Sequence, residues 1–108
     1  MKYLTIVLLM GCSFIYAAEN NEEVVCPKIG ELAGGIMELR QKGMDMSVVM
    51  DAMAVGANAN KEEKSVAKVV RLLIIDAYGR SRYSSKEYID NAVADFRNSA
   101  LLSCYKSR

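Results

Sequence analysis

Histidine and tryptophan are absent from this chain of 108 residues, which contains one proline and three cysteines. The lack of histidine removes the commonest general base and the usual partner of cysteine in zinc sites. The sequence has no glycine-rich phosphate-binding motif and no carboxylates at a metal-binding spacing. No serine has a histidine to activate it. We therefore expect that the protein is not an enzyme and uses no cofactor.

A large net charge is also absent, because 14 basic residues face 13 acidic ones. Lys2 is the one charged residue before Glu19, so a chain cleaved between Ala18 and Glu19 carries no net charge. A neutral domain lacks the excess of positive charge that nonspecific nucleic-acid binding or attraction to an anionic membrane surface requires. We expect no nucleic-acid partner.

The first 18 residues have the order of a secretory signal peptide. Lys2 precedes an apolar run, Ala17 and Ala18 offer a cleavage site, and a polar segment begins at Glu19. This order predicts a signal peptide over residues 1–18 and a protein located in the periplasm or secreted.

The mature chain is then one helical domain over residues 19–108, with its core in 26–105. Two alternatives tether it to a membrane. Leu9-Met10-Gly11-Cys12 resembles the motif at which bacterial lipoproteins are lipidated, so Cys12 is a candidate lipid attachment site. The apolar leader is also near the lower length limit for a helix that spans a bilayer and stays uncleaved.

Cys26 and Cys104 are the two cysteines that remain after cleavage. Export places them in an oxidising compartment, where such a pair forms a disulfide. A bond that encloses nearly the whole mature chain stabilises it by about 4 to 5 kcal/mol in the chain-entropy model. That is similar to the whole net stability of a small domain, about 5 kcal/mol or slightly more.

Apolar residues recur at helical spacing through most of the mature chain. The pattern predicts an all-α fold, a small antiparallel bundle of about four helices closed by one disulfide. Leu72 and Ile75 add apolar surface outside the apolar stripe of the third helix, which is formed by Val66, Val69, Val70, Leu73, Ile74 and Ala77. We therefore expect this helix to be the central and most buried one. The expected helices cover residues 27–42, 47–55, 61–78 and about 84–104.

Capping residues predict where these helices begin and end. Pro27 suits the first position of a helix and Gly43 suits its end. Ser47 or Asp45 can cap the second helix. Two pairs have the spacing of a capping box, namely Asn60 with Glu63 and Ser84 with Glu87. Gly34 and Gly35 weaken the first helix and are best explained by the close approach of another helix.

Four methionines, Met44, Met46, Met50 and Met53, crowd into ten positions of the chain. Met50 and Met53 suit the core, where methionine is a routine filler of gaps. Met44 and Met46 are candidates for a flexible surface that binds a partner helix. A metal site is the alternative, because clustered thioethers can hold Cu(I).

The segment AYGRSRYSS contains a second cluster, formed by Tyr78, Arg80, Arg82 and Tyr83. Two guanidinium groups between two tyrosines suit an anion, a carboxylate-bearing partner or a glycan. The alternative is a solvated loop whose tyrosines cover the end of the bundle and whose arginines pair with nearby carboxylates. Asp76 lies one helical turn before Arg80 in an apolar stretch, which favours a structural ion pair over a catalytic acid.

Three segments together resemble a group of uncharacterised small exported proteins of bacteria and their phages. The segments are IMELRQKGMDMSVVM over residues 36–50, IIDAYGRSRYSS over 74–85 and AVADFRNSALLSC over 92–104. The resemblance implies an all-helical, disulfide-closed domain with two mature cysteines, and it implies no activity.

These observations favour a small periplasmic or secreted protein that acts by binding another protein, as an inhibitor, an immunity protein or a phage lysis or exclusion regulator does. The candidate contact residues are Tyr78, Arg80, Arg82, Tyr83, Met44 and Met46. The alternative functions are a small-ligand or Cu(I) binder and a lipoprotein anchored through Cys12.

Overall fold

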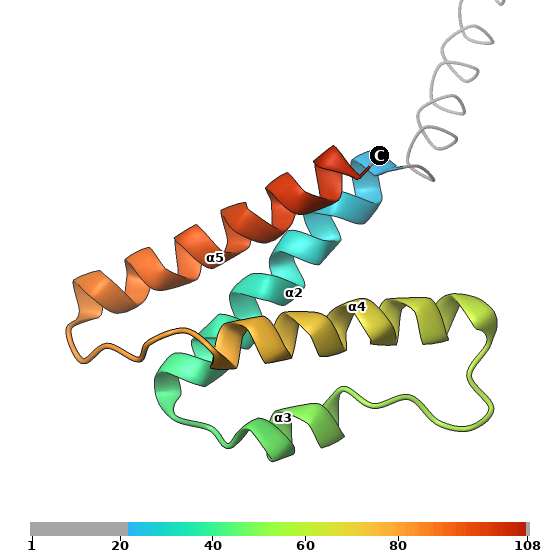
Figure 1. The fold of residues 1–108 in the computed structure, drawn as a ribbon, viewed down its shortest axis with the longest axis horizontal. Helices are drawn as coiled ribbons and strands as arrows, with labels where there is room; N and C mark the ends of the chain where they lie inside the picture. Colours follow the sequence, from blue (N-terminus) through green and yellow to red (C-terminus); the bar gives the residue numbers. More distant parts are fainter. Residues whose placement is uncertain (1–21, 108) are drawn as a thin grey trace, which may run out of the picture.

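A computed structural model describes residues 22–107, and all the regular structure in this range is helical. The predicted all-α class is confirmed. The predictions for residues 1–18, including Cys12, lie outside the described residues. Within 22–107, none of the helices has the length and apolar character needed to cross a membrane. The helices are α2 (Glu22–Lys42), α3 (Met46–Ala52), α4 (Lys61–Tyr78) and α5 (Lys86–Lys106) (Figure 1).

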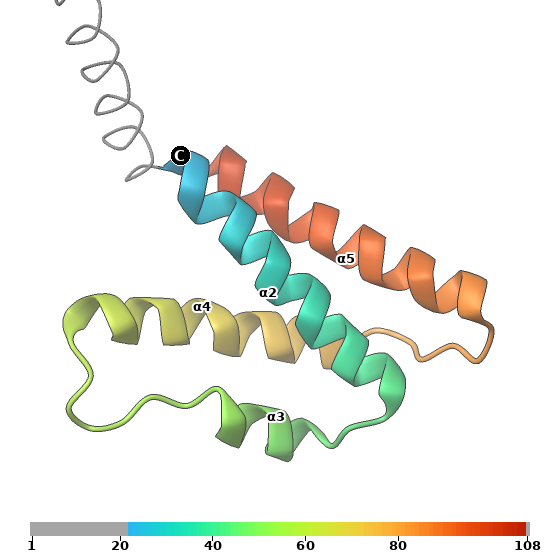
Figure 2. The ribbon, with the colours of Figure 1, turned by 180° about the vertical axis from the view of Figure 1, so that it is seen from behind.

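Helices α2 and α5 lie side by side and antiparallel in both views (Figures 1 and 2). Cys26 and Cys104 form the predicted disulfide at one end of the pair, with their Cα atoms 5.7 Å apart. Further along, Gly30 is buried against the side chain of Leu101 on α5. Because glycine has no side chain, the two helices approach closely at this point.

The expectation of a close approach at Gly34 and Gly35 is half right. A Cβ atom added to Gly34 would lie 3.2 Å from the guanidinium of Arg97 on α5, whereas one added to Gly35 would meet nothing within 4 Å. Gly30 is the glycine that the helix contact needs most, because a Cβ there would lie 2.9 Å from Leu101. Positions 30 and 34 are one helical turn apart and therefore face the same neighbour.

The central helix is α2, so the prediction that residues 61–78 form the most buried helix is wrong. Helix α2 contacts α3, α4 and α5, whereas α4 packs mainly on α2 and α3. Only Val70, Ile74 and Ala77 of α4 are buried, and Leu72 remains 59% exposed. The apolar arc of α4 is wider than the surface that its neighbours cover.

The core lies between α2 and the other three helices. Ile36, Met37 and Phe96 are its largest fully buried residues in the hydrophobic cluster. The remaining members are Ala33, Val49, Val70, Ile74, Ala77, Val93 and Ala100.

The first helix begins earlier than expected. Helix α2 starts at Glu22, and Pro27 lies inside it rather than at its first position. Because proline has no backbone N–H, the helix lacks the hydrogen bond that residue 27 would donate to the carbonyl of Glu23. Because Pro27 is exposed and near the helix start, water can reach the region of this carbonyl.

Helix α2 ends at Lys42, and Gly43 follows it as the predicted stop. Gly43 has a φ of 87°, in the left-handed region that favours glycine. The Gly43 N–H donates to the Arg40 carbonyl at 3.0 Å, and the Met44 N–H donates to the Leu39 carbonyl at 3.1 Å. This pair of hydrogen bonds is a Schellman motif, which satisfies carbonyls at the helix end.

The predicted capping box at the start of α4 is confirmed, because Asn60 and Glu63 each accept a hydrogen bond from the backbone of the other. Helix α5 is capped by Ser85 instead of the predicted Ser84, and the Ser85 hydroxyl accepts from the Tyr88 N–H. The shift of one residue places Tyr88, rather than Glu87, at the third helical position.

Helix α3 covers residues 46–52, so it starts one residue before the predicted range and stops three residues before its end. Asp45 occupies the capping position, although its side chain makes no capping hydrogen bond. The Met53 N–H is shared between the carbonyls of Val49 and Met50, and Ala54 donates to Asp51. These tighter bonds mark a last turn of 3₁₀ type, after which the helix does not continue.

Candidate binding surfaces

Gln41, on the last turn of α2, is the buried polar side chain that organises one end of the molecule. It is 4% exposed. Its Nε2 donates to the Ser81 carbonyl at 2.8 Å, and its Oε1 accepts from the Tyr83 N–H at 2.8 Å. The single amide therefore fixes the backbone of the loop between α4 and α5 against the end of α2.

Other polar contacts reinforce this attachment. Arg40 donates from Nε and Nη2 to the Arg80 carbonyl, at 3.2 and 2.9 Å. The Nε of Arg82 donates to the Gln41 carbonyl at 3.3 Å. Since two carbonyls of the loop and one of the helix end receive side-chain donors, the loop is held in one conformation by hydrogen bonds to α2.

Tyr78 joins the α4 end to the segment after α2. Its hydroxyl donates to the Met44 carbonyl at 2.6 Å, and the Arg40 guanidinium lies 5.2 Å from the centre of its ring. Burial raises the pKa of the Tyr78 hydroxyl above its ordinary value; the nearby Arg40 charge opposes this and the Asp45 charge adds to it. Burial dominates because it disfavours the charged phenolate.

Arg80 forms the predicted ion pair with Asp76, with Nε and Oδ1 3.3 Å apart. Its guanidinium also lies over the ring of Phe96, 4.8 Å from the ring centre. The apolar residues around Asp76 in the sequence suggest burial, but its side chain is 54% exposed. An exposed ion pair of this kind contributes between about 0 and 1 kcal/mol, so the contact with Phe96 is the more specific feature.

The two candidate clusters from the sequence meet at this end of the molecule. Tyr78 bonds to the backbone of Met44, and Gly43 lies against the Arg82 guanidinium. The most exposed apolar members are Met44, Met46 and Tyr83. We call the six candidates together the loop surface, which comprises Met44, Met46, Tyr78, Arg80, Arg82 and Tyr83.

The structure divides the four clustered methionines. Met50 and Met53 pack against the core, as the core interpretation predicts, while Met44 is 41% and Met46 37% exposed. A Cu(I) site that uses all four thioethers would need Met50 and Met53 to leave the packing positions that they occupy here. In the part of the chain that the structure describes, no three cysteine or carboxylate side chains gather as metal ligands.

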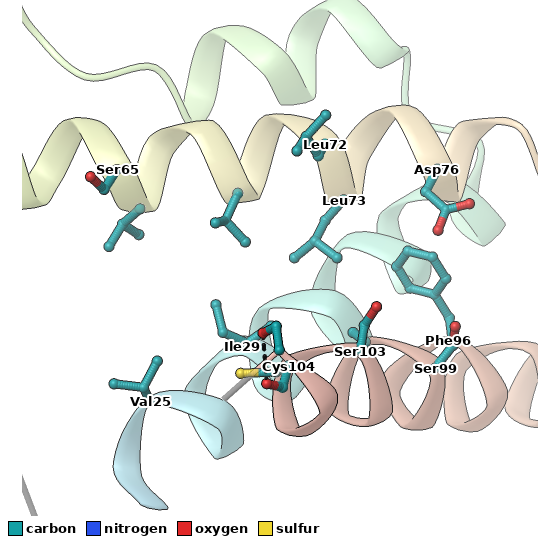
Figure 3. Close-up of a pocket in the computed structure, with 14 residues that line it drawn as sticks. Val25, Ile29, Ser65, Leu72, Leu73, Asp76, Phe96, Ser99, Ser103 and Cys104 are labelled. Carbon is teal, nitrogen blue, oxygen red and sulfur yellow. Dashed lines mark hydrogen bonds between the residues drawn. The ribbon is translucent and has the colours of Figure 1, made fainter. Parts of the chain in front are cut away.

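A groove between α4 and α5 was not expected from the sequence. It is a cleft of about 770 Å³ that is floored by α2 (Figure 3). Leu73 on α4 faces Ser99 and Ser103 on α5 across it, and Phe96 and Asp76 lie near one end. The full lining is Val25, Ile29, Ser65, Val66, Val69, Leu72, Leu73, Asp76, Phe96, Ser99, Ala100, Ser103, Cys104 and Ser107.

One signal for the groove was present in the sequence. Val66, Val69, Leu72 and Leu73 belong to an apolar arc on α4 that extends beyond the buried stripe of Val70, Ile74 and Ala77. The width of this arc predicts burial from the sequence, whereas in the structure Val66, Val69, Leu72 and Leu73 line a cleft.

Fold and surfaces together define a small all-helical domain that is closed by a disulfide and carries one ordered polar end and one apolar groove. The chain matches no protein-family model, no curated protein and no solved structure. The resemblance to small exported bacterial and phage proteins therefore remains a prediction from the sequence.

Proposed function

We propose that this chain is a small exported protein that has no catalytic activity and acts by binding another protein through the loop surface. The observation that carries the proposal is the attachment of the loop by Gln41 and Arg40. Their hydrogen bonds fix the backbone beside Tyr83 before any partner arrives. A surface that is already ordered loses less conformational entropy on binding.

The chemistry of the loop surface suits a protein partner. Tyrosine, arginine and methionine are enriched in protein interfaces relative to the rest of the surface. Tyr83 lies 5.9 Å from Tyr88, centre to centre, and both rings are exposed. Together with Arg82 they offer aromatic area and a positive charge, so the partner is expected to present a carboxylate beside an apolar contact.

The kind of partner that we expect depends on the signal peptide predicted over residues 1–18. An inhibitor, an immunity protein or a phage lysis or exclusion regulator is the kind of exported protein that has this size and no catalytic groups. Export would place the partner in the periplasm or outside the cell.

A photo-crosslinking amino acid at position 83, introduced in the native host, tests the proposal. We expect one reproducible protein adduct, and we expect its yield to fall when Arg82→Ala is added. The matched control is the same crosslinker at Tyr105, an exposed tyrosine on α5 outside the loop surface. Adducts of equal yield and identity at both positions, or none at position 83, would refute the proposal.

A further inference from the structure

The two cysteines of the disulfide differ in their access to solvent. Cys26 is 0% exposed and does not line the groove between α4 and α5. Cys104 is half-buried and belongs to the groove lining, where its side chain and sulfur are drawn in Figure 3. The groove lining also includes Ser103 and Ser107, which are close to Cys104 in the chain, exposed and small. The bond therefore has one covered side and one side that borders the groove.

We propose that the groove is the path by which a thiol reaches this disulfide, and that Cys104 is the residue that the thiol attacks. Exchange begins when a thiolate attacks one sulfur of the bond, so access decides which of the two sulfurs reacts. Attack on Cys26 would require the fold to open, because no part of this residue is exposed. Attack on Cys104 uses a cleft that is already present in the folded protein.

The burial of Cys26 also indicates which kind of thiol completes the reaction. When the incoming thiolate bonds to the Cys104 sulfur, the link to Cys26 breaks and Cys26 leaves as a thiolate with the electron pair. A charge released at a buried position is unfavourable. Return attack by this thiolate on Cys104 restores the original disulfide, so a reagent with a single thiol opens the bond only reversibly.

A dithiol reductant, such as an oxidoreductase with two neighbouring cysteines, removes this obstacle. Its second thiolate attacks its own first sulfur, forms the disulfide of the reductant and releases Cys104 as a thiolate. Two electrons pass from the dithiol to the protein disulfide, and solvent supplies a proton to each released thiolate. Any molecule that fills the groove would cover Cys104 and slow this reaction. The loop surface takes no part, so the proposal is independent of the proposed function.

Limited reaction of the oxidised full chain with β-mercaptoethanol tests the proposal. Cys12→Ser is included so that no third thiol takes part. Acid quenching at early times, followed by digestion and mass spectrometry, locates the first adduct. We expect about ten times more adduct on Cys104 than on Cys26, because only Cys104 borders the cleft. Equal adducts on both cysteines would overturn the proposal, since they would indicate attack on an opened chain.

Two tryptophan variants test whether the reagent enters through the groove. Ser103 and Leu102 are both exposed and lie within two residues of Cys104, but Leu102 does not line the groove. Ser103→Trp should slow the first reaction by about fivefold or more by narrowing access to the sulfur. Leu102→Trp is the matched control and should change the rate by less than about twofold. Equal rates in the two variants, both shown to be folded by circular dichroism, would refute the groove as the path.

Low concentrations of urea separate attack on the folded protein from attack after opening. The free energy of opening falls as urea is added, so a reaction that waits for opening accelerates with each increment. Attack through the groove should keep a nearly constant rate below the unfolding transition. A rate that rises steeply from the first additions of urea would overturn the proposal.

Discussion

The buried amide of Gln41 joins two parts of the chain that are about forty positions apart. Its partners, the Ser81 carbonyl and the Tyr83 N–H, have no other hydrogen bond described here. Leucine at position 41 would fill a similar volume and leave both groups unpaired. Because Ser81 and Tyr83 are exposed residues, water can reach these groups, and the loss is that of two hydrogen bonds at about 0.5 to 1.5 kcal/mol each. Gln41→Leu should therefore lower the free energy of unfolding by about 1 to 3 kcal/mol.

Urea unfolding with the disulfide intact measures this effect. Asn98→Leu, at an exposed position on α5, is the control and should change the free energy by less than about 0.5 kcal/mol. Equal stability of the Gln41 variant and the wild type would show that the amide does not hold the loop. The position of Gln41 in the sequence offered a clue, since it follows the buried Met37 by one helical turn.

Titration of the Tyr78 hydroxyl makes the free energy of unfolding depend on pH in the alkaline range. Burial raises the pKa of the folded-state phenol above 10.0, its ordinary value. The unfolded chain therefore loses this proton first, so the stabilisation by the neutral phenol is present below pH 10 and is lost as the pH rises through the folded pKa. The Tyr78→Phe variant cannot titrate here and also lacks the hydrogen bond to Met44.

The quantity to measure is the difference in unfolding free energy between the wild type and Tyr78→Phe. Below pH 9 the wild type should be more stable by about 1 kcal/mol, the usual net contribution of a hydrogen bond. The difference should shrink above pH 10. A difference that grows with pH would contradict the raised pKa, and Tyr105→Phe controls for the titration of an exposed tyrosine.

Helix α2 shows why the helices could be predicted from the sequence while their arrangement could not. Capping residues and periodicity predicted the observed bounds of α4, Lys61–Tyr78, because those signals are local. The central position of α2 depends on Gly30, Ala33 and Gly34, which are buried without adding much apolar surface. A ranking of the helices by apolar content therefore predicts α4 as the central helix. In the structure, the bulky Leu72 of α4 remains exposed. Small residues reveal a close contact only when the neighbouring helix is known.

The same helix supplies a pair of substitutions with opposite effects. Gly30→Ala places a methyl group 2.9 Å from Leu101, and such overpacking costs about 1 to 3 kcal/mol. Gly35→Ala meets nothing within 4 Å, so it should stabilise the protein by about 0.5 to 1 kcal/mol through helix propensity. Thermal unfolding of both variants compares them directly. The assigned face of α2 would be wrong if Gly30→Ala were the more stable of the two.

The candidate binding residues were predicted only in part, for a physical reason. Tyrosines and arginines at positions 78–83 mark a polar cluster, and their residue types are visible in the sequence. Which of them hold the loop depends on Arg40 and Gln41, which arrive from a distant segment. The groove depends in the same way on how α4 and α5 are placed relative to each other, which no local pattern specifies.

At the scale of the whole molecule, contacts link α2 to α5 or to the loop before it at both ends of the α2–α5 pair. Gln41 and its neighbours hold the loop at one end, and the disulfide between Cys26 and Cys104 joins the other. The α4 helix is attached at the loop end and faces α5 across the groove (Figure 3). The core between these ends is built from buried residues of α2, α3, α4 and α5.

The disulfide is therefore expected to account for much of the stability. It links residues 78 positions apart, a separation for which the chain-entropy model gives about 4 to 5 kcal/mol. Net stabilities of small domains begin at about 5 kcal/mol, so reduction should bring the protein close to unfolding at room temperature. The Cys26→Ala/Cys104→Ala variant should behave like the reduced protein, since either change removes the link without altering the loop end.

Urea unfolding of the oxidised, reduced and double-alanine forms, followed by circular dichroism, measures the loss. Cys12→Ser in every form prevents exchange with a third thiol if the full chain is retained. Identical unfolding midpoints for the oxidised and reduced forms would contradict the expectation. Two free thiols in protein recovered from its native compartment would contradict it more directly, because the link must exist there to hold α2 against α5.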